Sequence, residues 1–174
     1  PGFINLRLSP DAWRRELLAI AELGDDYGRS ALGDGQTVNV EYVSANPTGP
    51  MHMGHCRGAV VGDALASLLA ATGHRVTREY YVNDAGNQMR VFYDTLYSRF
   101  MQEAGKKTAL PDPAYPGEYL RILAATLLDE LGDGPVSKDK SEAIADIAPE
   151  ALKRTIDEIR GVLAQLGITY DQWF

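Results

Sequence analysis

The 174-residue sequence contains a single cysteine, Cys56, and no long apolar run. One cysteine cannot form an internal disulfide and cannot supply a multi-thiolate metal site. The longest mostly apolar run, residues 64–71, is interrupted by Ser67 and is far shorter than the ~20 residues of a membrane-spanning helix. The N-terminus lacks the basic, apolar and small-residue segments of a signal peptide. These features predict a cytoplasmic protein that does not interact with membranes.

Positive charge is also scarce, because 24 Asp and Glu residues outnumber 17 Lys and Arg residues and leave a formal net charge of −7. A dedicated nucleic-acid-binding domain presents a broad positive field, which this chain as a whole lacks. Any nucleic acid must therefore be held locally or by parts outside the chain. The length and the apolar content, 45% hydrophobic residues, suit one globular domain with its own core.

The N-terminal part predicts a strand, a helix and a loop. Residues 3–8, FINLRL, alternate apolar and polar side chains with the period of a half-buried strand. Ser9 and Pro10 form a helix start, with serine as the N-cap and proline in the first turn, and Gly24 ends that helix. The following loop is polar and Gly-rich, and the composition changes at Thr37.

A strand, a helix and a second strand are expected next. Residues 37–43 and 75–82 are rich in β-branched and aromatic residues, and residues 53–72 carry apolar side chains at helical spacing. Two strands joined by such a helix form a right-handed βαβ unit with parallel strands. Ligands of such sheets bind at the carboxyl ends of the strands, so a site is expected where the chain leaves Val43.

The remaining chain is predicted to be mainly helical. Apolar stripes at helical spacing occupy residues 89–100, 120–131 and 152–166. Pro149 is expected to start the third of these helices and Gly167 to end it. The last seven residues, ITYDQWF, look like the start of a strand or loop.

Residues 44–55, SANPTGPMHMGH, combine backbone constraints with two histidines. The prolines restrict φ, whereas the glycines let the backbone approach a ligand closely. His55 is expected in the first turn of the helix, where free N–H groups and the helix dipole favour an anion. His52 reaches the same space from just outside the helix, so the two imidazoles can donate to one phosphate group.

Other interpretations of these residues are open at this point. The two histidines and Cys56 could ligate zinc, but the one other histidine, His74, lies beyond the helix, so no metal site is expected. The histidines could also be ordinary loop and helix-end residues. Glu41 could be a solvated charge or could pair with Arg57 or Arg78.

The motif and its surroundings resemble a known enzyme family. A His-x-Gly-His element after the first strand resembles the first signature of class I aminoacyl-tRNA synthetases, which related nucleotidyltransferases share. The longer stretches VEYVSANPTGPMHMGHCRG and REYYVNDAGNQM are similar to those of bacterial-type arginyl-tRNA synthetases. AYPGEYL and LGITYDQW also look familial, and the resemblance is clearest from Val38 to Met89.

The resemblance implies an α/β fold: the first half of a Rossmann-like class I synthetase nucleotide-binding fold with a mostly helical insertion. Residues 1–36 would be the end of an N-terminal additional domain with a linking helix and loop. Residues 37–88 would be the first half of the catalytic domain, and residues 89–174 its helical insertion, truncated at the C-terminus.

The resemblance also implies that the parent enzyme activates arginine to arginyl-adenylate with ATP and transfers it to tRNA(Arg). ATP would enter as its Mg²⁺ complex, and no protein-bound zinc is expected. His52 and His55 would be catalytic and would bind ATP together with Ser44 and Gly54. The whole signature motif comprises Ala45, Asn46, Pro47, Thr48, Gly49, Pro50, Met51, His52, Met53, Gly54 and His55.

Arginine would contact Glu41 and Asn46, because a carboxylate suits the guanidinium and an amide suits the polar head of the amino acid. Asp84, Asn87 and Gln88 match a second motif and are implied to line the same pocket. These three residues could instead cap and start the next helix.

The sequence departs from the family in one respect, since the lysine-containing second signature has no counterpart. Residues 136–143, VSKDKSEA, contain lysines and resemble that signature in composition, but they lie in the helical region, so the similarity is taken as coincidence. Gly49 and Pro50 occupy the place where some members carry a compensating lysine. The isolated chain is therefore expected to be inactive, and an exposed sheet edge predicts self-association. A standalone His-x-Gly-His nucleotidyltransferase and a non-catalytic nucleotide-binding module are the alternatives.

Overall fold

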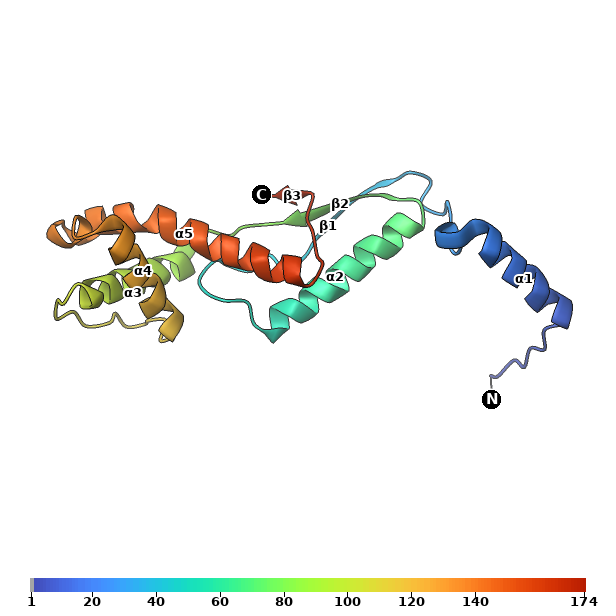
Figure 1. The fold of residues 1–174 in the computed structure, drawn as a ribbon, viewed down its shortest axis with the longest axis horizontal. Coiled ribbons are helices and arrows are strands. Elements are labelled where there is room, and N and C mark those ends of the chain that lie inside the picture. Colours follow the sequence, from blue (N-terminus) through green and yellow to red (C-terminus); the bar gives the residue numbers. More distant parts are fainter. Residues whose placement is uncertain (1) are drawn as a thin grey trace.

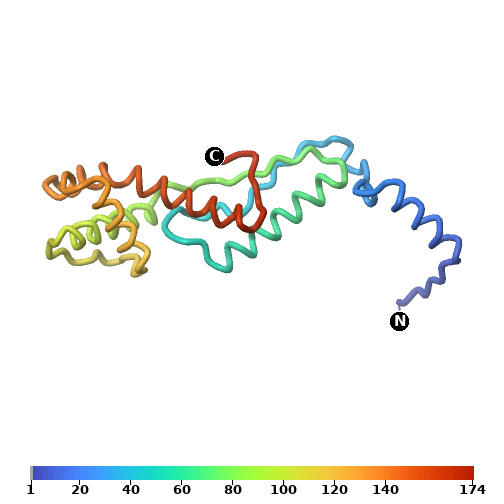
Figure 2. The backbone as a smooth tube through the Cα atoms, in the orientation of Figure 1, coloured from blue at the N-terminus to red at the C-terminus, as the bar shows by residue number. Residues whose placement is uncertain are grey.

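The computed structural model of the protein describes residues 2–174 and has an elongated shape (Figures 1 and 2). Its parallel sheet has the strand order β1-β2-β3, formed by β1 (Thr37–Glu41), β2 (Arg75–Tyr80) and β3 (Gln172–Trp173). The α-helices are α1 (Pro10–Leu23), α2 (Met53–Ala71), α3 (Gly86–Glu103), α4 (Glu118–Leu131) and α5 (Lys140–Gln165). The chain is thus an α/β protein, as predicted. None of the helices in the described part is long and apolar enough to cross a membrane.

The predicted βαβ unit is confirmed by β1, α2 and β2. The two strands pair in parallel, with Thr37 opposite Arg75 and Glu41 opposite Glu79. Helix α2 begins at the residue that the pattern predicted, and the chain turns back to β2 at Gly73, where φ is +90°. The carboxyl end of β1 therefore leads directly into the His-x-Gly-His segment.

Two apolar clusters hold the elements together. The sheet cluster joins β1 and β2 to α2 and α5, and its buried members are Val40, Tyr42, Ala59, Ala66, Tyr80, Ile159, Leu163 and Ile168. The helical cluster lies among α3, α4 and α5, and its buried members are Met89, Phe92, Leu96, Phe100, Leu120, Ala124, Leu127, Ile147 and Ala151. Each large side chain in these sets stabilises the fold by about 1.5–3 kcal/mol through its burial. Helix α5 contributes to both clusters and so connects the helical part to the sheet.

The N-terminal prediction was half right. Residues 2–9 form no strand, because no other strand of the described chain pairs with them, and Ile4 and Leu6 are exposed. The helix is confirmed, since the Ser9 side chain accepts a hydrogen bond from the Ala12 amide at 3.3 Å and the helix ends before Gly24. In Figure 1, α1 lies apart at one end of the molecule, and none of its residues is buried.

The predicted start of the last helix at Pro149 was wrong. Helix α5 begins at Lys140, because the Asp139 side chain caps it by accepting a hydrogen bond from the Glu142 amide at 3.0 Å. Pro149 lies inside the helix, where it removes one backbone hydrogen bond. Buried residues on both sides of the proline, Ile147 and Ala151, pack in the helical cluster and keep the helix continuous. The predicted end near Gly167 and the start of a terminal strand are confirmed.

Candidate functional site

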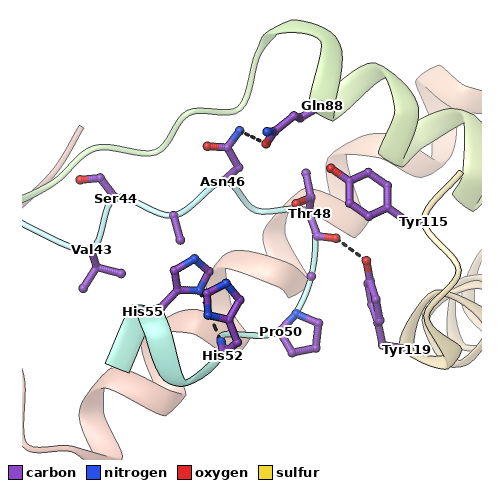
Figure 3. A pocket seen from close by; sticks show the side chains of 12 residues that line it. Val43, Ser44, Asn46, Thr48, Pro50, His52, His55, Gln88, Tyr115 and Tyr119 are labelled. Atoms are coloured by element: carbon purple, nitrogen blue, oxygen red, sulfur yellow. Dashed lines mark hydrogen bonds between the residues drawn. The ribbon is translucent and has the colours of Figure 1, made fainter. Parts of the chain in front are cut away.

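A cavity of about 470 Å³ opens at the carboxyl end of β1, where the sequence predicts a binding site. Residues 43–55, the signature segment, form most of its wall, and α3 and the region around the start of α4 supply the rest (Figure 3). The lining residues are Val43, Ser44, Ala45, Asn46, Thr48, Gly49, Pro50, His52, His55, Gln88, Tyr115 and Tyr119. Its volume is within the usual range for small-molecule sites.

The backbone is strained where the chain enters the cavity. Val43 and Ser44 both have positive φ values, +67° and +41°, which cost on the order of 1–3 kcal/mol each in a non-glycine residue. The Ser44 amide donates to the Tyr42 carbonyl at 3.0 Å, and the Ser44 hydroxyl accepts from the Tyr81 amide at 3.1 Å. Such strain is typical of functional sites, because the surrounding structure must maintain it.

Tyr80 fixes the backbone of Ala45, the residue after Ser44, by two hydrogen bonds. Its hydroxyl donates to the carbonyl of Ala45 at 3.0 Å and accepts from the amide of Ala45 at 3.1 Å. Burial raises the pKa of Tyr80 to about 12, so the hydroxyl keeps its proton at neutral pH. Both backbone groups of a buried residue are thereby satisfied by one side chain from β2, which fixes the cavity wall to the sheet.

His52 and His55 form a reciprocal cap at the start of α2. The Nδ1 atom of His52 accepts from the Gly54 amide at 3.1 Å, and the Nδ1 atom of His55 accepts from the His52 amide at 3.4 Å. The two rings stack with centroids 3.7 Å apart and an interplanar angle of 18° (Figure 3). The caps orient both imidazoles and bring them to the same wall of the cavity.

The caps also determine what the imidazoles can donate. An Nδ1 atom that accepts a hydrogen bond carries no proton, so a neutral ring carries its proton on Nε2. Burial lowers the pKa of His55, and repulsion from charge on His52 lowers it further. The first turn of α2 contains no acidic residue. Two N–H donors and a helix N-terminus therefore meet at one place, and together they favour a bound anion.

Asn46 and Gln88 link the signature segment to α3. The Asn46 Nδ2 atom donates to the Gln88 Oε1 atom at 2.6 Å (Figure 3). Of the three residues in the second motif, only Gln88 lines the main cavity. Asn87 lines a neighbouring cavity together with Asn46 and Gln88, and its Oδ1 atom accepts from Arg90 at 2.7 Å.

The other predicted site residues lie outside the main cavity. Asp84 lines a separate cavity beside Arg160 and Trp173 and does not line the main cavity. It does not cap α3 either, because the cap residue is Ala85 and makes no side-chain hydrogen bond. Asp84 lies before the start of α3, whereas Gln88 lies in the first turn of that helix. From there Gln88 contacts Asn46 of the signature segment.

Glu41 ends β1 and is exposed, but it does not line the cavity. Its Cα partner on β2 is Glu79, so the two carboxylates leave the sheet on the same face. Arg78 pairs with Asp63 at 3.5 Å rather than with Glu41. Across residues 2–174, neither Glu41 nor Arg57 forms an ion pair.

The sequence interpretation missed Tyr115 and Tyr119 as cavity residues. Both line the main cavity from the segment around the start of α4 (Figure 3). The Tyr119 hydroxyl donates to the Thr48 carbonyl at 2.6 Å. The one available signal was the resemblance of AYPGEYL, which contains both tyrosines, to the enzyme family. Nothing in the spacing places these tyrosines against a segment about 70 positions earlier.

No group of three or more His, Cys, Asp and Glu side chains in the described part of the chain is arranged to hold a metal ion. His52 and His55 use their Nδ1 atoms as helix caps. Cys56 is a free cysteine.

Comparisons with known proteins agree with the sequence resemblance. The family model described as tRNA synthetases class I (R), catalytic domain, matches residues 18–113. An arginine–tRNA ligase of Novosphingobium aromaticivorans is 52% identical over 171 residues, which are 98% of this chain and 29% of that protein. An arginine–tRNA ligase of Roseobacter denitrificans is 49% identical over 174 residues, which are 100% of this chain and 30% of that protein. The chain thus spans about 30% of the length of these curated relatives.

Two solved structures have a similar fold. A crystal structure from Campylobacter jejuni, described as a candidate arginyl-tRNA synthetase, has a TM-score of 0.81 and 33% identity, covering 96% of this chain and 36% of that one. The Thermus thermophilus arginyl-tRNA synthetase has a TM-score of 0.52 and 24% identity, covering 97% of this chain and 27% of that one. The second likeness concerns the fold alone.

Proposed function

Because the chain belongs to the class I tRNA synthetases for arginine, we propose that it is the part of an arginine–tRNA ligase that holds ATP while arginine is activated. The observation that carries the proposal is the His52–His55 cap, which presents two N–H donors and a helix N-terminus to one cavity. ATP enters as its Mg²⁺ complex. No observation favours a standalone nucleotidyltransferase or a non-catalytic nucleotide-binding module.

The reaction needs no covalent bond to the protein. A carboxylate oxygen of arginine forms a bond to the α-phosphorus of ATP, the bond from that phosphorus to the bridging oxygen breaks, and pyrophosphate leaves. A hydroxyl of the terminal ribose of tRNA(Arg) then takes the arginyl group, and AMP leaves. Catalysis therefore rests on positioning and on stabilising the negative charge that develops on phosphate oxygens.

His52 and His55 donate from their Nε2 atoms to phosphate oxygens, and the positive end of the α2 dipole adds to the attraction, since the first turn carries no acidic residue. Gly54 has no side chain, so the phosphates can approach the backbone of that turn. The Ser44 hydroxyl accepts from the Tyr81 amide, which leaves its own proton free to donate to the nucleotide. The hydrogen bonds already made within the fold support these proposed roles, because they leave the Nε2 atoms and the Ser44 proton without a partner in the described chain.

Glu41 and Asn46 contact arginine in this proposal. A carboxylate can bind the guanidinium with two parallel hydrogen bonds. The neighbouring Glu79 adds negative charge on the same face of the sheet, and a bound cation relieves the repulsion between the two carboxylates. Asn46 uses its Nδ2 atom for Gln88, so its Oδ1 atom is free to accept from the amino group of arginine.

We also propose the division of the chain that the resemblance implies. Residues 1–36 end an N-terminal domain, residues 37–88 begin the catalytic domain, and residues 89–174 are its helical insertion. The partners of the parent enzyme are tRNA(Arg), arginine and ATP, and its compartment is the cytoplasm. The isolated chain is inactive, because it lacks the lysine-containing second signature.

Arginine-dependent exchange of pyrophosphate into ATP tests the proposal. The native polypeptide that carries this chain is expected to catalyse exchange, and the 174-residue chain alone is not. Replacing His52 or His55 by alanine should lower the exchange rate by roughly 10²–10³-fold, as expected for the loss of a transition-state donor. His74→Gln, which changes a histidine outside the cavity, is the matched control.

Two results would contradict the proposal. If the native polypeptide shows no arginine-dependent exchange, the assigned activity is wrong. If the 174-residue chain exchanges pyrophosphate by itself, the chain is not an incomplete part of the catalytic domain.

A further inference from the structure

The ring of Tyr119 lies against two glycines that are far apart in the sequence. A Cβ atom at Gly49 would lie 2.8 Å from both Cζ and Oη of Tyr119. A Cβ atom at Gly117 would overlap the edge of the same ring. Gly49 belongs to the signature segment, and Gly117 is the N-cap residue of α4. The ring therefore fits tightly between the signature segment and the start of α4.

The hydroxyl of Tyr119 adds a polar contact at the same place. It donates to the Thr48 carbonyl at 2.6 Å (Figure 3). The Thr48 amide donates in turn to the Asn46 carbonyl at 2.8 Å. Burial raises the pKa of Tyr119 to about 12, so the hydroxyl remains a donor at neutral pH. The contact therefore fixes a tight turn of the signature segment by one strong hydrogen bond.

The backbone of α4 at Tyr119 is held in place by packing. The next residue, Leu120, is completely buried in the helical cluster, and Tyr119 packs at the edge of that cluster. Thr48 lies four positions before His52, with the rigid Pro50 between them. A displacement of Thr48 is therefore transmitted to the residue whose side chain caps α2 and stacks on His55.

We propose that Tyr119 is a positioning residue that latches the signature segment to α4 and so keeps His52 and His55 aligned with the phosphates. The proposal deepens the function proposed above and rests on it for its activity readout. Tyr119 acts through the Thr48 carbonyl rather than on the substrate. Its loss therefore lowers kcat and leaves the KM for ATP nearly unchanged.

Tyr119→Phe in the native polypeptide is the main test, because it removes the hydroxyl and keeps the ring. We expect kcat for pyrophosphate exchange to fall roughly tenfold or more, since a small misplacement of catalytic groups can cost up to ~10²-fold. The KM for ATP should change by less than about twofold, the pattern of an interaction that matters in the transition state. Tyr97→Phe, on α3 and outside the cavity, is the matched control.

Glycine variants test the same latch from the other side. Gly49→Ala places a methyl group against the tyrosine ring and should lower kcat as Tyr119→Phe does. Gly161→Ala, an exposed helical position where a Cβ atom meets nothing within 4 Å, is the control. In a Tyr119→Ala background the added methyl has no ring to meet, so Gly49→Ala should have little further effect.

A readout without catalysis separates the latch from the proposed function. The ring nitrogens of His52 and His55 can be observed by NMR in the native polypeptide labelled with [15N]histidine. Tyr119→Phe should shift these signals, and Tyr97→Phe should not.

If the signals shift but the wild type shows no exchange, the latch is supported and the proposed activity fails. If the wild type is active and Tyr119→Phe changes neither kcat nor the histidine signals, the latch is overturned. If Tyr119→Phe raises the KM for ATP at unchanged kcat, Tyr119 is a binding contact and the latch is also overturned.

Discussion

Gly62 of α2 lies directly against the ring of Tyr42, so closely that a Cβ atom at position 62 would overlap the root of the tyrosine side chain. Tyr42 follows β1, and its ring also stacks on Tyr170 with centroids 4.6 Å apart. Because the methyl group would meet Cβ and Cγ of Tyr42 rather than a flexible tip, the ring cannot move away easily. The glycine therefore sets the distance between α2 and the strand that leads into the cavity.

Gly62→Ala should destabilise the protein by roughly 1–3 kcal/mol, because the added methyl overpacks a buried contact. Gly161→Ala should instead stabilise it by roughly 0.4–1 kcal/mol through the unfolded state, since its position is exposed and helical. Urea titration followed by far-UV circular dichroism measures both. Equal unfolding midpoints for the two variants would show that α2 can shift away from Tyr42.

Tyr80→Phe should cost roughly 1–3 kcal/mol, because it leaves the amide and the carbonyl of buried Ala45 without their partner. Tyr93→Phe is the control, since Tyr93 is partly buried and its hydroxyl makes no hydrogen bond to another described residue. The free energy of unfolding in urea gives the comparison. A loss no larger than that of Tyr93→Phe would mean that water or another group replaces the hydroxyl.

The stability of the protein should depend on pH through His55. Burial and repulsion from His52 lower its folded pKa below the ordinary value of 6.5. The unfolded chain therefore takes up the proton first as the pH falls through 6.5, and stability decreases until the folded protein is protonated as well. Urea midpoints between about pH 5 and 8 should show this slope. His55→Asn should flatten it, and an NMR titration of His55 with a midpoint at or above 6.5 would contradict it.

The isolated chain should self-associate through α2. Several apolar side chains of this helix are exposed, including Val61 at 63% and Leu68 at 65%, and water favours covering such a surface. Sedimentation velocity should show species larger than the monomer as the concentration rises. A Val61→Lys, Leu68→Lys double variant should be monomeric, whereas Ile122→Lys on α4 should behave like the wild type. A monomer at every concentration of the unmodified chain would count against the prediction.

Local features of the fold were predictable because neighbouring residues decide them. Ser9 caps α1, Gly73 turns the chain into β2, and the apolar spacing of α2 marks its start and end to within a residue. The interpretation of residues 3–8 as a strand was wrong, because alternating apolar and polar side chains show only that one face of a strand could be buried. A strand also needs a partner for its backbone, and the described chain offers none there.

Long-range contacts of the site were not predictable. No periodicity brings Tyr119 to Thr48 or Tyr80 to Ala45, since these pairs depend on how the helical cluster and the sheet pack. The separation of Asp84 from Gln88 has the same origin. The two residues are four apart in the sequence, yet they line different cavities because α3 begins between them.

The sequence by itself determined which groups are present and in what local order: a strand, a constrained segment, and two histidines at the start of a helix. Hydrogen bonds within three residues suffice to cap α2 and orient both rings. Only the tertiary structure decided what holds that segment in place. Hydrogen bonds from Tyr81 to Ser44 and from Tyr80 to Ala45 hold the strained stretch at Val43 and Ser44, and Tyr119 holds Thr48. Such contacts form only when distant elements pack together.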